Sequence, residues 1–256
     1  MANVFYELAN PARFESWATP IRPALGGVAL SLIALGLYFG LFNSPADYQQ
    51  GDTVRIMYVH VPAAWMAMAC YTSMTISSAV GFIWKHPLAD VAAKSTAPIG
   101  AVFTALALIT GALWGQPTWG TWWVWDARLT SVLVLLFMYL GYMAIWTAFD
   151  DQTRAAKIAA IVCMVGFVNI PIIKFSVDWW NSLHQPASVI RADGPSIDGS
   201  MLTPLLLMAL GYTVLFVYLL FANMSAEIAE RRIARRQQAV RPVSTLQPGA
   251  PTETAS

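Results

Sequence analysis

Long apolar runs alternate with short polar connections along most of the chain. Six runs have no acidic residue in their interior, and each is long enough to cross the roughly 30 Å hydrocarbon core of a bilayer as a helix. They cover residues 24–42, 61–84, 97–114, 129–149, 157–175 and 201–223. Because a helix satisfies its backbone polar groups internally, the pattern predicts an all-α integral membrane protein built as a six-transmembrane-helix bundle.

Basic residues are divided unequally between the two sides of the predicted bundle. The side that holds both chain ends receives 11 Lys and Arg residues, and the other side receives 4. The larger group is Arg13, Arg22, Lys85, Lys94, Arg154, Lys157, Arg231, Arg232, Arg235, Arg236 and Arg241, and the smaller is Arg55, Arg128, Lys174 and Arg191. By the positive-inside rule, both termini are predicted to be cytoplasmic.

Composition agrees with a membrane protein and excludes several other classes. The chain is 57% apolar and 11% charged, against about 25% charged in soluble domains. A net charge of +1 provides no concentrated basic face for nucleic acid. Cys70 and Cys163 lack the spacing of zinc or covalent haem motifs and are predicted to be buried core residues. We expect a cytoplasmic N-terminal segment (1–23), a membrane domain (24–223) and a basic, partly disordered cytoplasmic tail (224–256).

The second external connection is dominated by tryptophan. Five of the 11 tryptophans lie within residues 114–125. If residues 119–126 form a short amphipathic helix, Trp119, Trp122 and Trp123 share one face, and the helix lies flat at the membrane surface. An aromatic belt at the membrane interface explains one or two tryptophans per helix end, but not five in one loop. Packed indoles offer a flat apolar ligand a large surface with little entropy to lose, which favours a ligand platform.

The run from Trp119 to Thr130, WGTWWVWDARLT, resembles the signature of the WWD-motif family of haem-handling proteins, which serve cytochrome c biogenesis. The six-span length and the position of two external histidines resemble the haem-delivery branch of the bacterial cytochrome c maturation system. The resemblance covers about residues 20–225. Other members that share the motif are much longer chains.

This resemblance implies a transport and assembly factor rather than an enzyme. The chain would bind haem b at the periplasmic face of the inner membrane and deliver it to a periplasmic haem chaperone. Its other partners would be the ATPase and membrane subunits of an ABC-type complex, a small single-span membrane subunit and the lipid bilayer, with no nucleic acid. No GxxxxGK[ST] motif occurs in the chain, so the ATPase must be a separate polypeptide.

Two of the three histidines, His60 and His184, fall on the external side, before and after the tryptophan run. Imidazole is a common axial ligand of haem iron. A lone interfacial histidine is usually a hydrogen-bonded surface residue, but here that explanation has to hold twice on one face. The resemblance assigns the two axial positions to His60 and His184. His86 lies on the cytoplasmic side and is expected to be a solvated loop residue.

The remaining expected site residues surround the tryptophan run. Haem would lie against Trp119, Trp122, Trp123 and Trp125. Arg128 follows the run and is favoured over Arg55 as a partner for a haem propionate, although either can instead anchor the interface or pair with a nearby aspartate. Asp126 is expected to cap the next helix or to pair with Arg128 rather than to contact iron.

The fifth apolar run contains polar residues that we expect to be structural. Pro171 removes a backbone hydrogen bond and bends the helix, and Asn169 bonds to the freed backbone or to a neighbouring helix. Lys174 lies close enough to the outer surface to extend its ammonium group into the interface.

Two other function classes compete with haem delivery. A permease subunit for another solute should carry several ionisable residues deep within its spans, and few are present. A b-type haem electron carrier should have facing histidine pairs within the spans, whereas all three histidines lie at span edges.

Overall fold

The computed structural model describes residues 9–185, 188–189, 191 and 193–240. The elements are α2 (Pro11–Tyr38), the π-helix η1 (Phe39–Asn43), the 3-10 helix η2 (Asp52–Ile56), α3 (Met57–Trp84), α4 (Pro87–Trp119), α5 (Ala127–Ala148), α6 (Gln152–Gly166), α7 (Asn169–Trp179) and α8 (Gly199–Val240). Within this described part there are no β-strands, and 6 helical segments are long and apolar enough to cross a membrane, with α6 and α7 together forming one of them. The all-α, six-span prediction is confirmed.

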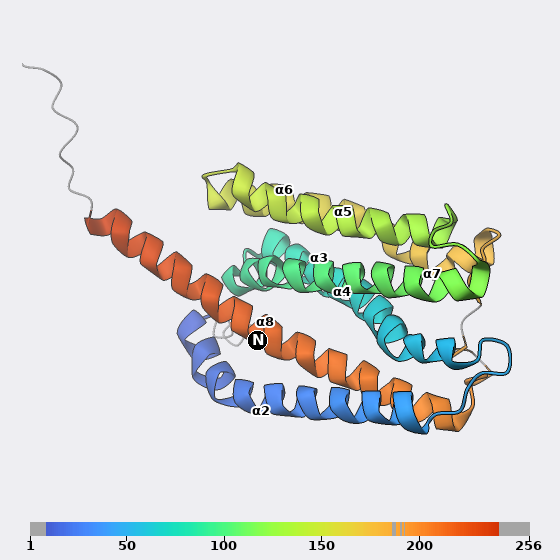
Figure 1. The fold of residues 1–256 in the computed structure, drawn as a ribbon. Coiled ribbons are helices and arrows are strands. Elements are labelled where there is room, and N and C mark those ends of the chain that lie inside the picture. The colour runs from blue at the N-terminus through green and yellow to red at the C-terminus, as the bar shows by residue number, and fades with distance from the viewer. Residues whose placement is uncertain (1–8, 186–187, 190, 192, 241–256) are drawn as a thin grey trace, which may run out of the picture.

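The helices pack as three layers (Figure 1). Antiparallel α2 and α8 form the first, α3 and α4 the second, and α5 with α6 and α7 the third, and α8 makes the contact between the first two layers. Small residues allow the close approach. A Cβ atom on Gly36 would lie 2.7 Å from Met208 Cγ, which brings α2 against α8. A Cβ on Gly100 would overlap the Tyr139 ring, so α4 and α5 also meet at a glycine.

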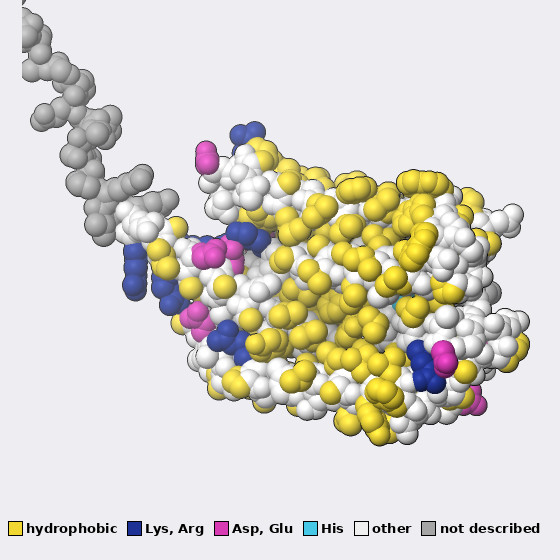
Figure 2. All heavy atoms as spheres, viewed as in Figure 1, with side chains coloured by type: hydrophobic (Ala, Val, Ile, Leu, Met, Phe, Trp, Pro, Cys, Tyr) yellow, Lys and Arg dark blue, Asp and Glu magenta, His cyan; other side chains and the backbone are white. Residues whose placement is uncertain are grey.

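Both described ends of the chain lie at the same end of the bundle. The first turns of α2 and the last turns of α8 are found there, whereas the α4–α5 and α7–α8 connections lie at the opposite end (Figure 1). Lys and Arg side chains gather where α8 leaves the bundle, and apolar side chains cover the flank between the two ends (Figure 2). An even number of crossings accounts for this arrangement.

Polar contacts in the core tie the layers together. Tyr139 Oη donates to Ala67 O at 2.7 Å, and Tyr71 Oη donates to Cys163 O at 3.3 Å. Cys70 and Cys163 are both buried and free, as predicted.

An ion cluster near the chain-end side joins α4 to α8. Glu227 is buried, and its carboxylate lies 2.7 Å from Lys94 Nζ and 2.6 Å from Arg231 Nε. Both cations also lie over the Trp146 ring of α5. The cluster therefore links three helices where the bundle is most basic.

Helix boundaries differ from the expected ones at both ends of the chain. The first helix begins at Pro11 rather than near residue 24, because Asn10 caps it and Pro11 suits the first helical turn. It bends near its beginning, where Pro20 and Pro23 lie inside the helix (Figure 1). The last helix continues past residue 223 to Val240, and residues 241–256 of the expected tail lie outside the described residues.

The fifth span is broken rather than only bent. α6 ends at Gly166 and α7 begins at Asn169, two residues before Pro171. Proline has no backbone N–H to donate to the carbonyl four residues earlier, and its ring crowds that turn. The Asn169 side chain donates to Ser131 O at 2.9 Å, the expected bond to a neighbouring helix.

Candidate functional site

A cavity of about 390 Å³ lies at the loop end of the bundle, among α3, α4, α5, α7 and the segment after α7. This volume is in the range of small-molecule sites, about 300–1,000 Å³. Side chains from the helix interiors form an apolar floor, which includes Ala64, Ala67, Met68, Ala107, Val132 and Leu135. Polar groups line the loop end, including Gln50, Arg128, Lys174, Asp178 and Gln185. The cavity therefore suits a ligand that is mostly apolar but carries polar groups along one edge.

His60 is the fourth residue of α3 and lines this cavity. Its Nδ1 lies 3.0 Å from Ala107 O and 3.1 Å from Thr110 Oγ1. A carbonyl oxygen only accepts, and the Thr110 hydroxyl already donates to Leu106 O at 2.6 Å. The proton of neutral His60 is therefore on Nδ1, and Nε2 keeps a free lone pair.

The wall behind His60 is built to the shape of its ring. A Cβ atom on Gly111 would lie 2.9 Å from His60 Cε1, so only glycine leaves room at this position. The Trp114 ring packs edge-on against the imidazole with centroids 5.7 Å apart. Trp114 is itself held by Gln50, whose Oε1 accepts from the indole Nε1 at 2.7 Å. The first external loop and α4 thus fix His60 together.

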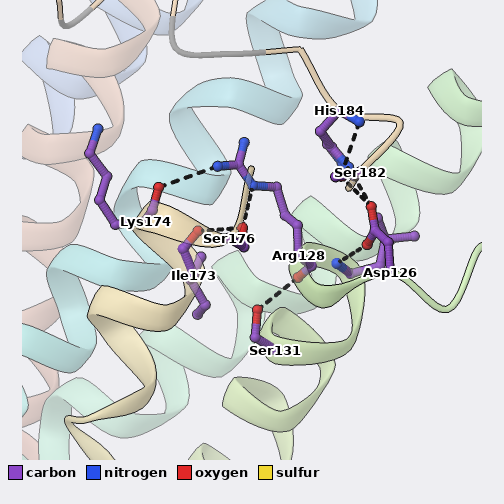
Figure 3. A network of polar contacts seen from close by, with 9 residues as sticks. Asp126, Arg128, Ser131, Ile173, Lys174, Ser176, Ser182 and His184 are labelled. Atoms are coloured by element: carbon purple, nitrogen blue, oxygen red, sulfur yellow. Dashed lines mark hydrogen bonds and ion pairs between the residues drawn. The ribbon is translucent and has the colours of Figure 1, made fainter. Parts of the chain in front are cut away.

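His184 lines the same cavity from the segment after α7. Its Nδ1 lies 3.2 Å from Asp126 Oδ2, and Ser182 Oγ donates to the same oxygen (Figure 3). The other Asp126 oxygen accepts from Leu129 N at 2.7 Å and caps α5. The Trp119 ring lies 4.8 Å from the imidazole, edge to face. Because a carboxylate only accepts, His184 also carries its proton on Nδ1, and Nε2 is left unpaired among the described residues.

The charge states of this pair follow from burial and hydrogen bonding. Burial lowers the pKa of His184, and the attraction of Asp126 only partly opposes that shift. Burial alone would raise the pKa of Asp126, but hydrogen bonds from Ser182, the Leu129 amide and His184 outweigh burial and lower it. At neutral pH a neutral imidazole therefore faces a carboxylate.

The tryptophan segment has a different conformation from the expected one. No helix spans 119–126: Trp119 is the last residue of α4, and Gly120, with φ of 76°, ends that helix in the left-handed region. In the irregular chain that follows, Trp123 lines the cavity, whereas Trp122 is 59% exposed and lies outside the lining. The prediction of one shared helical face is wrong, because adjacent side chains of an extended segment point in opposite directions.

Four tryptophans border the cavity: Trp65 of α3, and Trp114, Trp119 and Trp123 from the tryptophan-rich run. Trp125 is 76% exposed, and its ring packs edge-on against Trp123 with centroids 5.4 Å apart. Trp122 and Trp125 therefore lie beside the cavity rather than in its wall.

The two candidate arginines are separated by the fold. Arg128 lines the cavity, and its guanidinium donates to Ser176 Oγ at 3.1 Å and to Lys174 O at 3.4 Å (Figure 3). It makes no ion pair with Asp126 within the part of the chain that the structure describes, so Asp126 acts as a cap instead. Arg55 pairs with Asp52 at 3.1 Å and is not part of the cavity lining.

The third histidine is far from this site. His86 is the cap residue before α4, at the opposite end of the bundle, and it is half-buried rather than fully solvated. Thr110 and Gly111 could not be found from the sequence, because they contact His60 only through the packing of α3 against α4. Ser182 carried a weak signal, since it lies two residues before His184.

The chain is similar in sequence to a family of known proteins. A family model described as "Heme exporter protein C" matches residues 4–239. The chain is 57% identical to the heme exporter protein C of Bradyrhizobium diazoefficiens, over 90% of this chain and 88% of that one. It is 45% identical to the Escherichia coli K12 protein of that name, over 88% and 90%. A putative cytochrome c biosynthesis ccmC-like mitochondrial protein of Marchantia polymorpha is 47% identical, over 80% and 86%.

Proposed function

The chain belongs to the heme exporter protein C family, and we propose that it holds haem in the cavity between His60 and His184 and delivers it to a periplasmic haem chaperone. Membership in this family supports a role in haem transport for cytochrome c biogenesis. The protein acts as a membrane transport and assembly factor, and its cargo is a flat, largely apolar macrocycle.

One observation carries the proposal. Two histidines from distant parts of the chain line one cavity, and each binds a fixed acceptor through Nδ1, which leaves Nε2 free. This is the usual preparation of a metal-binding imidazole, in which an outer hydrogen bond sets the tautomer and the ring orientation. No cluster of three or more His, Cys, Asp or Glu side chains with metal-site geometry occurs in the described residues. Two axial imidazoles are, in contrast, a sufficient protein ligand set for haem iron.

Other residues of the cavity wall suit the porphyrin ring around the iron. Trp114, Trp119 and Trp123 supply aromatic walls, and the alanine-rich floor accepts apolar ring edges. Both imidazoles are half-buried in the cavity wall.

The two imidazoles are not equivalent, and the difference suggests an order of release. His184 is hydrogen-bonded to a carboxylate, whereas His60 is hydrogen-bonded to the neutral Ala107 carbonyl. A carboxylate partner raises the basicity of its imidazole and strengthens the bond to iron. We expect His60 to dissociate first when the cargo leaves.

The cellular setting belongs to the same proposal. The multi-pass chain lies in the bacterial inner membrane with both termini in the cytoplasm, so the cavity faces the periplasm. Haem b is the form bound. The chaperone docks at this face, and ABC-type ATPase and membrane subunits with a small single-span subunit complete the complex.

The test is a spectrum of the purified protein with added haem. We expect low-spin bis-histidine absorption in the wild type, altered spectra in His60→Ala and in His184→Ala, and restoration by free imidazole. His86→Ala, at the other end of the bundle, is the matched control and should be unchanged. A wild type that binds no haem would leave a permease subunit as the better reading. Reversible redox cycling without transfer to a chaperone would instead favour an electron carrier.

A further inference from the structure

The turn of residues 47–51, just before η2, holds one glutamine side chain against the cavity. Gln50 is half-buried and lines the cavity from the first external loop. Its backbone N–H donates to Asp47 Oδ1 at 2.8 Å, and its backbone carbonyl accepts from Thr53 Oγ1 at 2.7 Å. Two backbone hydrogen bonds between Asp47 and Gly51, at 3.1 and 2.9 Å, close the turn, and Gly51 has a φ of 58°, which favours glycine. The position of Gln50 is therefore set by the turn itself.

The side chain of Gln50 holds Trp114, which belongs to α4. Gln50 Oε1 accepts from Trp114 Nε1 at 2.7 Å. Among the tryptophans of the cavity lining, Trp114 is the one whose indole N–H has a hydrogen-bond partner in the part of the chain that the structure describes, whereas the buried Trp123 Nε1 has none there. The Trp114 ring in turn packs edge-on against the imidazole of His60, with centroids 5.7 Å apart. Two direct contacts thus connect Gln50 to His60.

The two imidazoles are positioned by different elements. His184 takes its orientation from Asp126, which also caps α5. His60 is held by α4, through the Ala107 carbonyl, and by Trp114, whose indole is anchored to the first external loop. A change in that loop therefore reaches one imidazole and leaves the hydrogen bond of the other intact.

We propose that Gln50 is a positioning residue, which sets the plane of the His60 imidazole through Trp114, so that the first external loop controls the weaker of the two iron bonds. This inference rests on the proposed haem function and adds to it a means of controlled release. An axial bond is strongest when the Nε2 lone pair points straight at the iron, and a ring that is free to tilt loses that alignment. Movement of the loop would loosen His60 while His184 still held the cargo.

The experiment uses the purified full-length chain loaded with ferric haem and compares Gln50→Leu with the wild type. Leucine is similar in size but accepts no hydrogen bond. The electron paramagnetic resonance spectrum of low-spin ferric haem depends on the angle between the two axial imidazole planes, so we expect shifted g-values in Gln50→Leu. Cyanide, followed by absorption, should displace His60 at an about two- to tenfold lower concentration, as the loss of one hydrogen bond implies. Trp114→Phe, which keeps an aromatic ring without an N–H, should reproduce both changes.

Two control variants test whether the hydrogen bond itself is responsible. Gln49→Leu changes the neighbouring exposed side chain, which lies outside the cavity lining, and should leave both measurements unchanged. Gln50→Glu restores an acceptor for the Trp114 N–H and should recover the wild-type g-values. Recovery by an acceptor distinguishes positioning through this hydrogen bond from a general effect on folding.

A comparison in two histidine backgrounds identifies the imidazole concerned. In His60→Ala the iron keeps only His184, and adding Gln50→Leu should change haem affinity by less than about twofold. In His184→Ala the iron keeps only His60, and the same addition should weaken haem binding by about two- to tenfold. Equal effects in the two backgrounds, or wild-type g-values and cyanide binding in Gln50→Leu, overturn the positioning role while low-spin binding leaves the haem function standing. Absence of low-spin binding in the wild type overturns the haem function itself.

Discussion

Replacing Gly111 by alanine adds one methyl group to α4 directly behind the His60 ring. The new Cβ would lie 2.9 Å from His60 Cε1, whereas an ordinary contact begins at 3.4 Å, so the ring must move by about half an ångström. His60 Nδ1 is held at 3.0 Å by Ala107 O, and Trp114 packs on the imidazole, so the ring cannot move without loss. The displaced ring should lose its hydrogen bond, which contributes about 0.5–1.5 kcal/mol.

Alanine in a helix interior is otherwise favourable, by roughly 1 kcal/mol relative to glycine. Folding of Gly111→Ala should therefore be little changed, while haem affinity falls by about two- to twelvefold. Gly141→Ala is the matched control, because it lies in α5 and a Cβ there meets no atom within 4 Å. Haem titration followed by the absorption spectrum measures both variants. Wild-type affinity and a wild-type spectrum in Gly111→Ala would refute the view that α4 positions His60 for ligation.

Three further predictions address the cavity wall, the pH dependence and the orientation. Trp123→Ala should weaken haem retention several-fold more than Trp122→Ala, because only Trp123 lines the cavity; equal effects would restore the platform of exposed rings. Since the folded-state pKa of His184 lies below its ordinary 6.5, the unfolded chain takes up that proton first. Thermal stability of the haem-free protein should therefore fall as the pH drops below 6.5, and His184→Gln should flatten that loss. In intact cells a cysteine replacing Gly194 should react with an impermeant thiol reagent and one replacing Gln237 should not, and the opposite pattern would invert the topology.

The length of the apolar runs was sufficient to predict the six spans, since a bilayer requires long apolar helices whatever their neighbours are. Helix ends were less predictable. The first helix starts at Pro11 and the last runs to Val240, because capping and ion pairs extend helices beyond the apolar stretch. The break before Pro171 was visible only as a proline in an apolar run, and its position depended on the local turn.

The sequence by itself determined the class of the protein, the candidate histidines and the concentration of tryptophan, because these depend on residue type and spacing along the chain. Only the tertiary structure decided which side chains share one cavity, since that depends on contacts between distant helices. It set Trp123 in the wall and Trp122 outside it, and it placed Arg128 rather than Arg55 beside the cavity. It also gave His60 a carbonyl and His184 a carboxylate, and no spacing along a chain can encode such hydrogen bonds across helices.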